Sequence, residues 1–143
     1  MIRGIVAAGA LVACLTSVMA QSNPIAERQQ LMKNLSQASR APGAMLKGET
    51  AFDLQVVQAT LKTYADVAAK APALFVQGAG SGETATLPAA YAKKADFDAK
   101  WAQFGKDATA AQVSIKDEAS LKATLPGVLR ACGACHEDYR AKK

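Results

Sequence analysis

The sequence has little histidine, little cysteine and no extended strand pattern. Its 143 residues include one histidine, His136, and three cysteines, of which only two lie after residue 20. A closed zinc site needs four nitrogen or sulfur ligands, which these residues do not supply. No segment alternates apolar and polar side chains long enough for a sheet, and alanine is abundant, so the composition favours helices. The 17 basic and 12 acidic residues are scattered, which argues against nucleic-acid binding.

Long apolar runs are also absent beyond the start of the chain. Arg3 is followed by an uncharged apolar stretch that ends in Val18-Met19-Ala20, a pattern typical of a secretory signal peptide cleaved before Gln21. The sequence therefore predicts a cleaved segment, 1–20, and one domain, 21–143, without a membrane span. Leu11-Val12-Ala13-Cys14 resembles a lipobox, which leaves a lipidated Cys14 as the alternative.

The cysteines and the histidine that are present form one motif, Cys132-Gly133-Ala134-Cys135-His136. This C-x-x-C-H pattern is typical of covalent haem attachment, in which two thiols bond to haem and the adjacent imidazole binds the iron. Spacings of three and four place these side chains on one face of a helix. The alternatives are a thioredoxin-type redox pair, part of a zinc site or a disulfide. The first expects a βαβ setting, the second needs further ligands, and the third leaves His136 unused.

Apolar periodicity predicts four helices. The first begins at Asn23 and Pro24 and runs toward Leu46, with a kink or early end at Pro42-Gly43. The second begins at a capping box of Thr50 and Asp53. The side chains expected to face the core are Ile25, Arg28, Met32, Leu35, Ser39, Pro42 and Leu46 in the first helix, Leu54, Val57, Leu61, Tyr64 and Ala68 in the second, Phe97, Trp101, Phe104, Ala108 and Ala111 in and just after the third, and Leu121, Leu125, Val128, Leu129, Cys132, Cys135, His136 and Tyr139 in the fourth.

The second helix is expected to close at Pro72, where a long connection, 72–92, rich in glycine, proline and threonine, begins. No phosphate-loop signature occurs in it. The third helix is expected over 92–110. The fourth begins near Asp117, carries the motif and should be distorted at Pro126-Gly127. Four amphipathic helices with one long connection predict an all-α, four-helix bundle.

The chain resembles the class II c-type cytochromes, the cytochrome c′ and cytochrome c-556 family. The resemblance rests on the ending C-x-x-C-H-x-x-Y-R, on Arg28-Gln29-Gln30-Leu31-Met32-Lys33 followed by Lys47-Gly48, and on the aromatic pair Phe97 and Phe104. It implies an antiparallel four-helix bundle with one covalently bound haem c. In that bundle Cys132 and Cys135 would hold the haem and His136 would be the proximal iron ligand. Arg28 would lie near a haem propionate, with Arg140 also near the haem.

The resemblance bears on the sixth position of the iron as well. Cytochrome c′ proteins place an apolar residue, often leucine, on the distal side, whereas c-556 proteins place methionine there. The corresponding residue here is Met32, one helical turn after Arg28. The single histidine excludes a second imidazole ligand. Met45, the other methionine after residue 20, is expected outside the apolar seam, beyond Pro42-Gly43. From the residues alone, Met32 would more simply fill core space, as methionine often does. The resemblance, together with the spacing from Arg28, implies that Met32 is the sixth ligand.

These residues predict an electron carrier and not an enzyme. It would be periplasmic, because haem of this kind is attached outside the bacterial cytoplasm, and redox proteins would be its partners. The alternative is a five-coordinate cytochrome c′ that binds nitric oxide or carbon monoxide. A peroxidase would need a distal acid–base residue, and the chain offers no second histidine for that role. The identity of the partners, the reduction potential and the choice between monomer and homodimer stay open.

Overall fold

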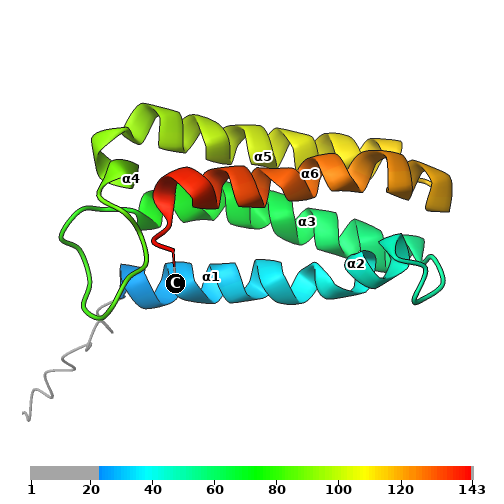
Figure 1. Ribbon diagram of the computed structural model, residues 1–143, viewed down its shortest axis with the longest axis horizontal. Coiled ribbons are helices and arrows are strands. Elements are labelled where there is room, and N and C mark those ends of the chain that lie inside the picture. The colour runs from blue at the N-terminus through cyan, green and yellow to red at the C-terminus, as the bar shows by residue number, and fades with distance from the viewer. Residues whose placement is uncertain (1–22, 143) are drawn as a thin grey trace, which may run out of the picture.

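The computed structural model describes residues 23–142, so the expected signal peptide and Cys14 lie outside the described residues. Four long helices run along the long axis of the molecule, each opposite in direction to the one before it (Figure 1). These are α1 (Pro24–Ala38), α3 (Leu54–Lys70), α5 (Lys94–Ser114) and α6 (Glu118–Tyr139); the shorter elements are α2 (Arg40–Leu46), the 3₁₀ turn η1 (Ala71–Leu74) and α4 (Ala89–Ala92). The all-α four-helix fold expected from the sequence is confirmed.

The first helix breaks earlier than its proline predicts. It ends at Ala38, and α2 starts at Arg40, so Pro42 lies in the first turn of α2, where its missing N–H costs nothing. Proline cannot donate to the carbonyl of Ala38, and that carbonyl instead accepts a hydrogen bond of 3.1 Å from Thr60 Oγ1 of α3. The hydroxyl of Ser39 turns back to the Leu35 carbonyl at 2.7 Å, a contact that bends helices. The helix therefore breaks at Ser39, three residues before the predicted break at Pro42-Gly43.

The other helix starts follow capping chemistry. Asp53 alone is the N-cap of α3, since its carboxylate accepts from the backbone N–H groups of Gln55 and Val56 at 2.9 and 3.1 Å. The capping box predicted for Thr50 and Asp53 is wrong, because Thr50 lies in the preceding turn. Asp117 caps α6 through a capping box with Ser120.

The remaining boundaries differ in detail from the expected ones. As predicted, α3 ends before Pro72. Helix α5 continues to Ser114, beyond the expected end at residue 110, because Ala108 and Ala111 pack into the core. Helix α6 runs unbroken through Pro126, so the distortion expected there does not interrupt it. No helix within residues 23–142 is long and apolar enough to cross a membrane.

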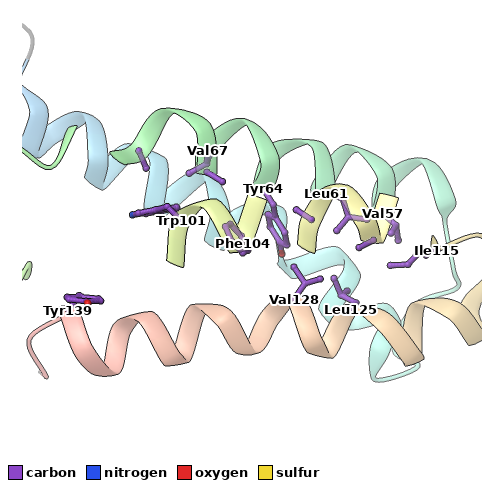
Figure 2. Close-up of a cluster of buried hydrophobic side chains, with 14 of the residues drawn as sticks. Val57, Leu61, Tyr64, Val67, Trp101, Phe104, Ile115, Leu125, Val128 and Tyr139 are labelled. Atoms are coloured by element: carbon purple, nitrogen blue, oxygen red, sulfur yellow. The ribbon is translucent and has the colours of Figure 1, made fainter. Parts of the chain in front are cut away.

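The core lies mainly between α3, α5 and α6 (Figure 2). Val57, Leu61, Leu121 and Leu125 are fully buried there, as their periodicity predicts. An aromatic row runs through the same region: Phe75, Phe97, Trp101, Phe104 and Tyr64, with Tyr139 at one end. In contrast, α1 supplies no fully buried side chain to this cluster; its apolar residues are only half-buried against it. Most of the buried core is therefore supplied by the other three long helices.

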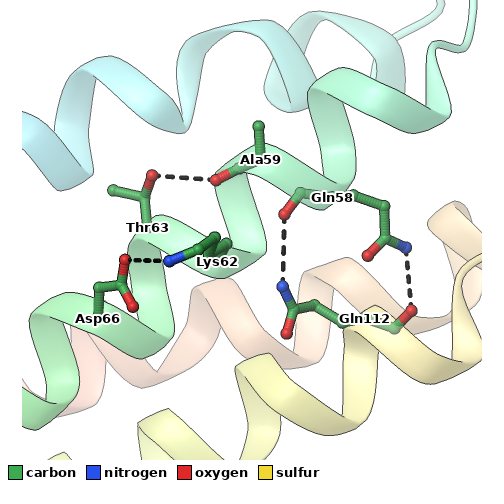
Figure 3. Close-up of polar contacts among 6 residues, drawn as sticks. All are labelled: Gln58, Ala59, Lys62, Thr63, Asp66 and Gln112. Atoms are coloured by element: carbon green, nitrogen blue, oxygen red, sulfur yellow. Dashed lines mark hydrogen bonds and ion pairs between the residues drawn. The ribbon is translucent and has the colours of Figure 1, made fainter.

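Polar contacts also tie α3 to α5. The side-chain amide of Gln58 donates to the Gln112 carbonyl at 2.9 Å, and the Gln112 amide donates to the Gln58 carbonyl at 3.5 Å (Figure 3). Further along, a Cβ on Gly105 would lie 3.1 Å from that of Ala68, so the two backbones approach closely. These contacts make the α3–α5 pair the rigid centre against which α6 is placed.

Tyr64 supplies a buried polar contact to the break between α1 and α2. Its hydroxyl lies 2.5 Å from Ser39 Oγ. Because the Ser39 hydroxyl already donates to Leu35, Tyr64 is the donor in this pair. Burial raises the pKa of Tyr64, which keeps the phenol protonated and able to donate.

Replacing Tyr64 with phenylalanine is expected to lower the free energy of unfolding by about 1 kcal/mol, the usual net value of one hydrogen bond. Tyr91→Phe is the matched control, because the Tyr91 hydroxyl makes no hydrogen bond within residues 23–142. Urea unfolding of the two variants measures the difference. Equal losses in both would mean that the Ser39 contact contributes nothing.

Candidate haem-attachment site

The C-x-x-C-H motif lies in the last turns of α6. Cys132 and Cys135 are half-buried, pack against the core and form no disulfide with each other. Cys135 lies three residues and His136 four residues after Cys132, so the two thiols and the imidazole share one side of the helix. His136 is exposed, so its ring is accessible beside two partly covered thiols.

The electrostatic surroundings keep all three groups neutral. Burial raises the pKa of the Cys132 thiol and of the Cys135 thiol. Partial desolvation lowers the pKa of His136, and the positive charge of Arg140 acts in the same direction. A neutral imidazole is the form that binds a metal ion. The side chain of Arg140 is itself exposed.

Helix α1 is set apart from the motif helix. No Cα atom of α1 comes within 8 Å of one of α6, although each contacts other elements of the bundle. Helices that pack directly have axes only about 8–10 Å apart, with Cα atoms closer than that. The two helices also share incomplete burial: Leu31, Met32 and Leu35 on α1 and Leu129, Cys132 and Cys135 on α6 are all half-buried. The two helices that carry the predicted haem ligands are thus separated from each other and leave these side chains incompletely buried.

Arg28 is a buried cation on α1. The side chain is 3% exposed, as its position in the apolar seam predicts. Its guanidinium donates to the Leu74 carbonyl at 3.2 Å and to Thr84 Oγ1 at 2.9 Å, and lies 5.1 Å from the centre of the Phe75 ring. All three partners are neutral, and no carboxylate of residues 23–142 lies within 4 Å. A buried charge without a counter-ion is costly, so this position is suited to an added anion.

These residues fit a covalently attached haem. Two accessible thiols and an imidazole share one face of α6, α1 stands away from that face, and a buried guanidinium without a carboxylate partner suits an acidic group. Cys132 and Cys135 would hold the porphyrin, His136 would bind the iron, and Arg28 would face a propionate. Bound in this way, a haem supplies one-electron redox chemistry and an iron that binds small ligands.

The two methionines are placed differently from each other. Met32 lies half-buried on α1, one turn after Arg28. Met45 was expected outside the apolar seam, and this is wrong: it is 5% exposed and packs in the main core from α2. The early break at Ser39 turns α2 so that Met45 points inward. Core packing therefore encloses Met45, whereas the side chain of Met32 remains partly accessible.

Sequence reasoning did not find the polar contacts of the long connection. Residues 75–88, here called the strap, cross the end of the bundle where α6 finishes and α1 begins (Figure 1). The side-chain amides of Asn23, the N-cap of α1, and of Gln29 in α1 donate to the Ser81 and Glu83 carbonyls, at 2.8 and 2.9 Å. On the other side, Leu87 N–H donates to the Tyr139 carbonyl at 2.9 Å. Contacts between residues so far apart in the sequence leave no pattern in either segment from which they could be predicted.

The strap approaches α1 very closely at Gly80. This residue has φ +86°, and a Cβ there would lie 2.6 Å from Asn23 Oδ1. Only glycine fits both the conformation and the space. On the opposite edge, Thr86 and Arg140 form an isolated antiparallel bridge, the one strand-like pairing within residues 23–142. The strap therefore joins α1 to the end of α6, two helices whose Cα atoms all lie more than 8 Å apart.

Tyr139 anchors the end of the motif helix. Its ring packs edge-on against Phe97 with centroids 5.1 Å apart, and its hydroxyl donates to the Asp96 carboxylate. This hydrogen bond, together with desolvation, raises the pKa of Tyr139 to about 12. The sequence places Tyr139 in the seam but gives no indication of Asp96 as its partner.

The raised pKa of Tyr139 predicts an alkaline loss of stability. Between pH 10 and 12 the unfolded chain loses this proton while the folded chain keeps it, so stability falls as pH rises through that window. Asp96→Asn should lower the Tyr139 pKa toward its ordinary value, as read from the tyrosinate absorbance at 295 nm. Asp98→Asn, two residues further along α5, is the control, because the Asp98 carboxylate pairs with Lys94 and not with Tyr139. An unchanged titration in Asp96→Asn would contradict the assignment.

A separate apolar groove of about 630 Å³ lies between α3 and α5, away from the motif. Small side chains line it, among them Ala65, Ala68 and Gly105. None of the motif residues contributes to it, so it is not part of the haem site.

A four-helix bundle with C-x-x-C-H on its last helix defines a c-type cytochrome of the bundle class. The family profile described as Cytochrome C′ matches residues 23–140. The chain is 48% identical over 126 residues to a cytochrome c′ of Rhodopseudomonas palustris, covering 87% of this chain and 86% of the relative. It is 36% identical over 148 residues to a cytochrome c-556 of the same organism, covering 100% and 99%.

Solved structures agree with the sequence relatives. A cytochrome c′ from Rhodopseudomonas palustris has a TM-score of 0.83 at 48% identity, covering 86% of this chain and 99% of that one. An NMR-validated structural model of oxidised cytochrome c556 from that organism has a TM-score of 0.77 at 33% identity, covering 84% of this chain and 97% of that one. The chain belongs to the cytochrome c′/c-556 family of class II c-type cytochromes. Proteins of this family carry electrons or bind gases and are not enzymes, and the cofactor is a haem c attached through Cys132 and Cys135.

Proposed function

We propose that this protein is an electron carrier whose single haem has His136 and Met32 as axial ligands, as in a c-556-type cytochrome. The observation that carries the proposal is Met32, half-buried on α1 one turn after Arg28, where the resemblance puts the distal residue. Overall identity, which is higher to cytochrome c′, measures how alike the scaffolds are. The coordination of the iron is decided by one side chain, and a thioether is a soft, neutral ligand that favours ferrous iron.

Three features of the chain support Met32 in this role. It stands on the helix that is set apart from α6, it is only half-buried, and it lies one turn from Arg28. The competing methionine, Met45, is enclosed in the core. With His136 as the sole histidine, no second imidazole is available. A ligand set of this kind changes little between oxidation states, and brief contacts with redox partner proteins suit such a carrier.

The second candidate is a five-coordinate cytochrome c′ that binds carbon monoxide or nitric oxide at the distal side. The specific observation in its favour is the higher similarity to cytochrome c′, 48% identity and a TM-score of 0.83, against 36% identity to the cytochrome c-556. In this reading Met32 only fills space beside the haem, as methionine often does in cores.

Optical spectra of the purified protein separate the two candidates. The proposal expects a low-spin ferric spectrum with a weak near-infrared band from sulfur-to-iron charge transfer, and slow or weak binding of carbon monoxide by the ferrous form. A high-spin ferric spectrum with ready carbon monoxide binding would reject Met32 as ligand and establish the second candidate.

We further propose that residues 1–20 are removed on export to the periplasm, since the family match begins only at residue 23 and haem c attachment requires an exported chain. Mass spectrometry of native protein should show a chain that starts at Gln21 with one haem. A diacylglyceryl group on Cys14 would instead place the protein on a membrane surface.

A further inference from the structure

The guanidinium of Arg28 is held by η1 and the strap and not by its own helix. Its Nη1 donates to the Leu74 carbonyl at 3.2 Å, and its Nη2 donates to Thr84 Oγ1 at 2.9 Å. The Phe75 ring covers the charge at 5.1 Å. Leu74 acts through its backbone and Phe75 through its ring face, so Thr84 is the only side chain that fixes the direction of the guanidinium by a hydrogen bond within residues 23–142.

Thr84 is itself held firmly, although it lies on the surface. Its Oγ1 also accepts the backbone N–H of Thr86 at 3.1 Å. The neighbouring Glu83 carbonyl accepts from Gln29, one residue after Arg28 on α1. On the other side of Thr84, the Ala85 carbonyl accepts from the Ala141 N–H at 2.8 Å. The strap is therefore held to the bundle on both sides of Thr84, and the hydroxyl oxygen has little freedom to follow a moving arginine. Because that oxygen accepts two hydrogen bonds, its own proton is directed elsewhere and is available to a further acceptor.

We propose that Thr84 is a positioning residue that aims the Arg28 guanidinium at a haem carboxylate and thereby sets the pH dependence of the haem reduction potential. The inference rests on the propionate role suggested for Arg28 and adds the residue that orients it. A guanidinium pairs best with a carboxylate in a fixed planar geometry, so a second, rigid neutral partner strengthens the pair by reducing its freedom. A well-aimed Arg28 keeps the acid ionised to lower pH; a loosely held one does not.

The test is a potentiometric titration of the holoprotein between pH 4 and 9. Thr84→Val keeps the shape of the side chain and removes the acceptor, so the midpoint of the pH dependence should move up by about 1 unit, the scale of one charge-assisted hydrogen bond. Thr84→Ser keeps the hydroxyl and should behave as the wild type. Thr86→Val is the matched control in the same strap, because its side-chain hydroxyl makes no hydrogen bond within residues 23–142.

Arg28→Gln separates this inference from the role on which it depends. If Arg28→Gln shifts the midpoint and Thr84→Val does not, Thr84 is only a surface residue and the proposal fails. If Arg28→Gln leaves the midpoint unchanged, both the propionate pairing and the positioning role fail. The axial-ligand proposal is unaffected by either result, because the near-infrared band reports Met32 independently. Thermal unfolding of each variant identifies any that merely loses stability, and Thr84→Ser remains interpretable in that case.

Discussion

Replacing Cys132 and Cys135 together with alanine is expected to abolish covalent haem attachment. Each thiol would form one bond to the haem, and these are the only cysteines after residue 20. After acid–acetone extraction and denaturing electrophoresis, haem stain should remain with the wild-type protein and be absent from the double variant. Either single variant should retain at most a weakened attachment through the other thiol.

The remaining cysteine gives the control for this experiment. Cys14 lies in the segment expected to be cleaved, so Cys14→Ser should leave haem content and the mass of the mature chain unchanged. His136→Ala tests the iron ligand separately, since both thiols remain and only the imidazole is lost. Covalent haem in the double cysteine variant would show that attachment does not use the motif.

Met32→Leu is expected to convert the protein to a gas-binding haem protein. Leucine has similar volume but no donor atom, so it should open the sixth position without a large packing cost. The ferric haem should move toward high spin, the near-infrared band should disappear, and the reduction potential should fall. In the wild type, carbon monoxide must displace the Met32 sulfur from the iron. If that sulfur–iron bond contributes about 1.4 kcal/mol or more, its loss should raise the carbon monoxide affinity roughly tenfold or more.

Met45→Leu is the matched control for Met32→Leu. The same chemical change is made in a methionine that is buried in the core, where it should cost less than about 1.5 kcal/mol of stability and leave the spectrum unchanged. Spectral change in Met45→Leu alone would transfer the ligand role to α2. No change in either variant would mean that neither sulfur binds the iron.

The parts of this fold that are local in sequence could be predicted. Periodic apolar positions identified the seams of α3, α5 and α6, down to Phe97, Trp101 and Leu125. The spacing within the C-x-x-C-H motif identified the candidate site, and an arginine in an apolar seam indicated that Arg28 is unusual. Each of these inferences needs only residues within a few helical turns.

The errors arose where a distant partner decides the local structure. The break at Ser39 depends on Thr60 of α3, which takes up the carbonyl that Pro42 leaves unpaired. The inward position of Met45 follows from that break. Thr84 and Asp96 are unremarkable in sequence and gain their importance from Arg28 and Tyr139, more than forty residues away. Hydrogen bonds of this range leave no periodic signal.

Because α1 is separated from α6, the four long helices should differ in how well their amide protons are protected from exchange with solvent. Helices α3, α5 and α6 share one continuous core, whereas α1 contacts α2, α3 and η1 and adds no fully buried side chain to the main core. Local opening of α1 therefore exposes less apolar surface than opening of any other long helix, and its amide protons should exchange first. A chain with α1 undocked would still hold α6 in place, with both thiols turned toward an open side and within reach of an incoming porphyrin.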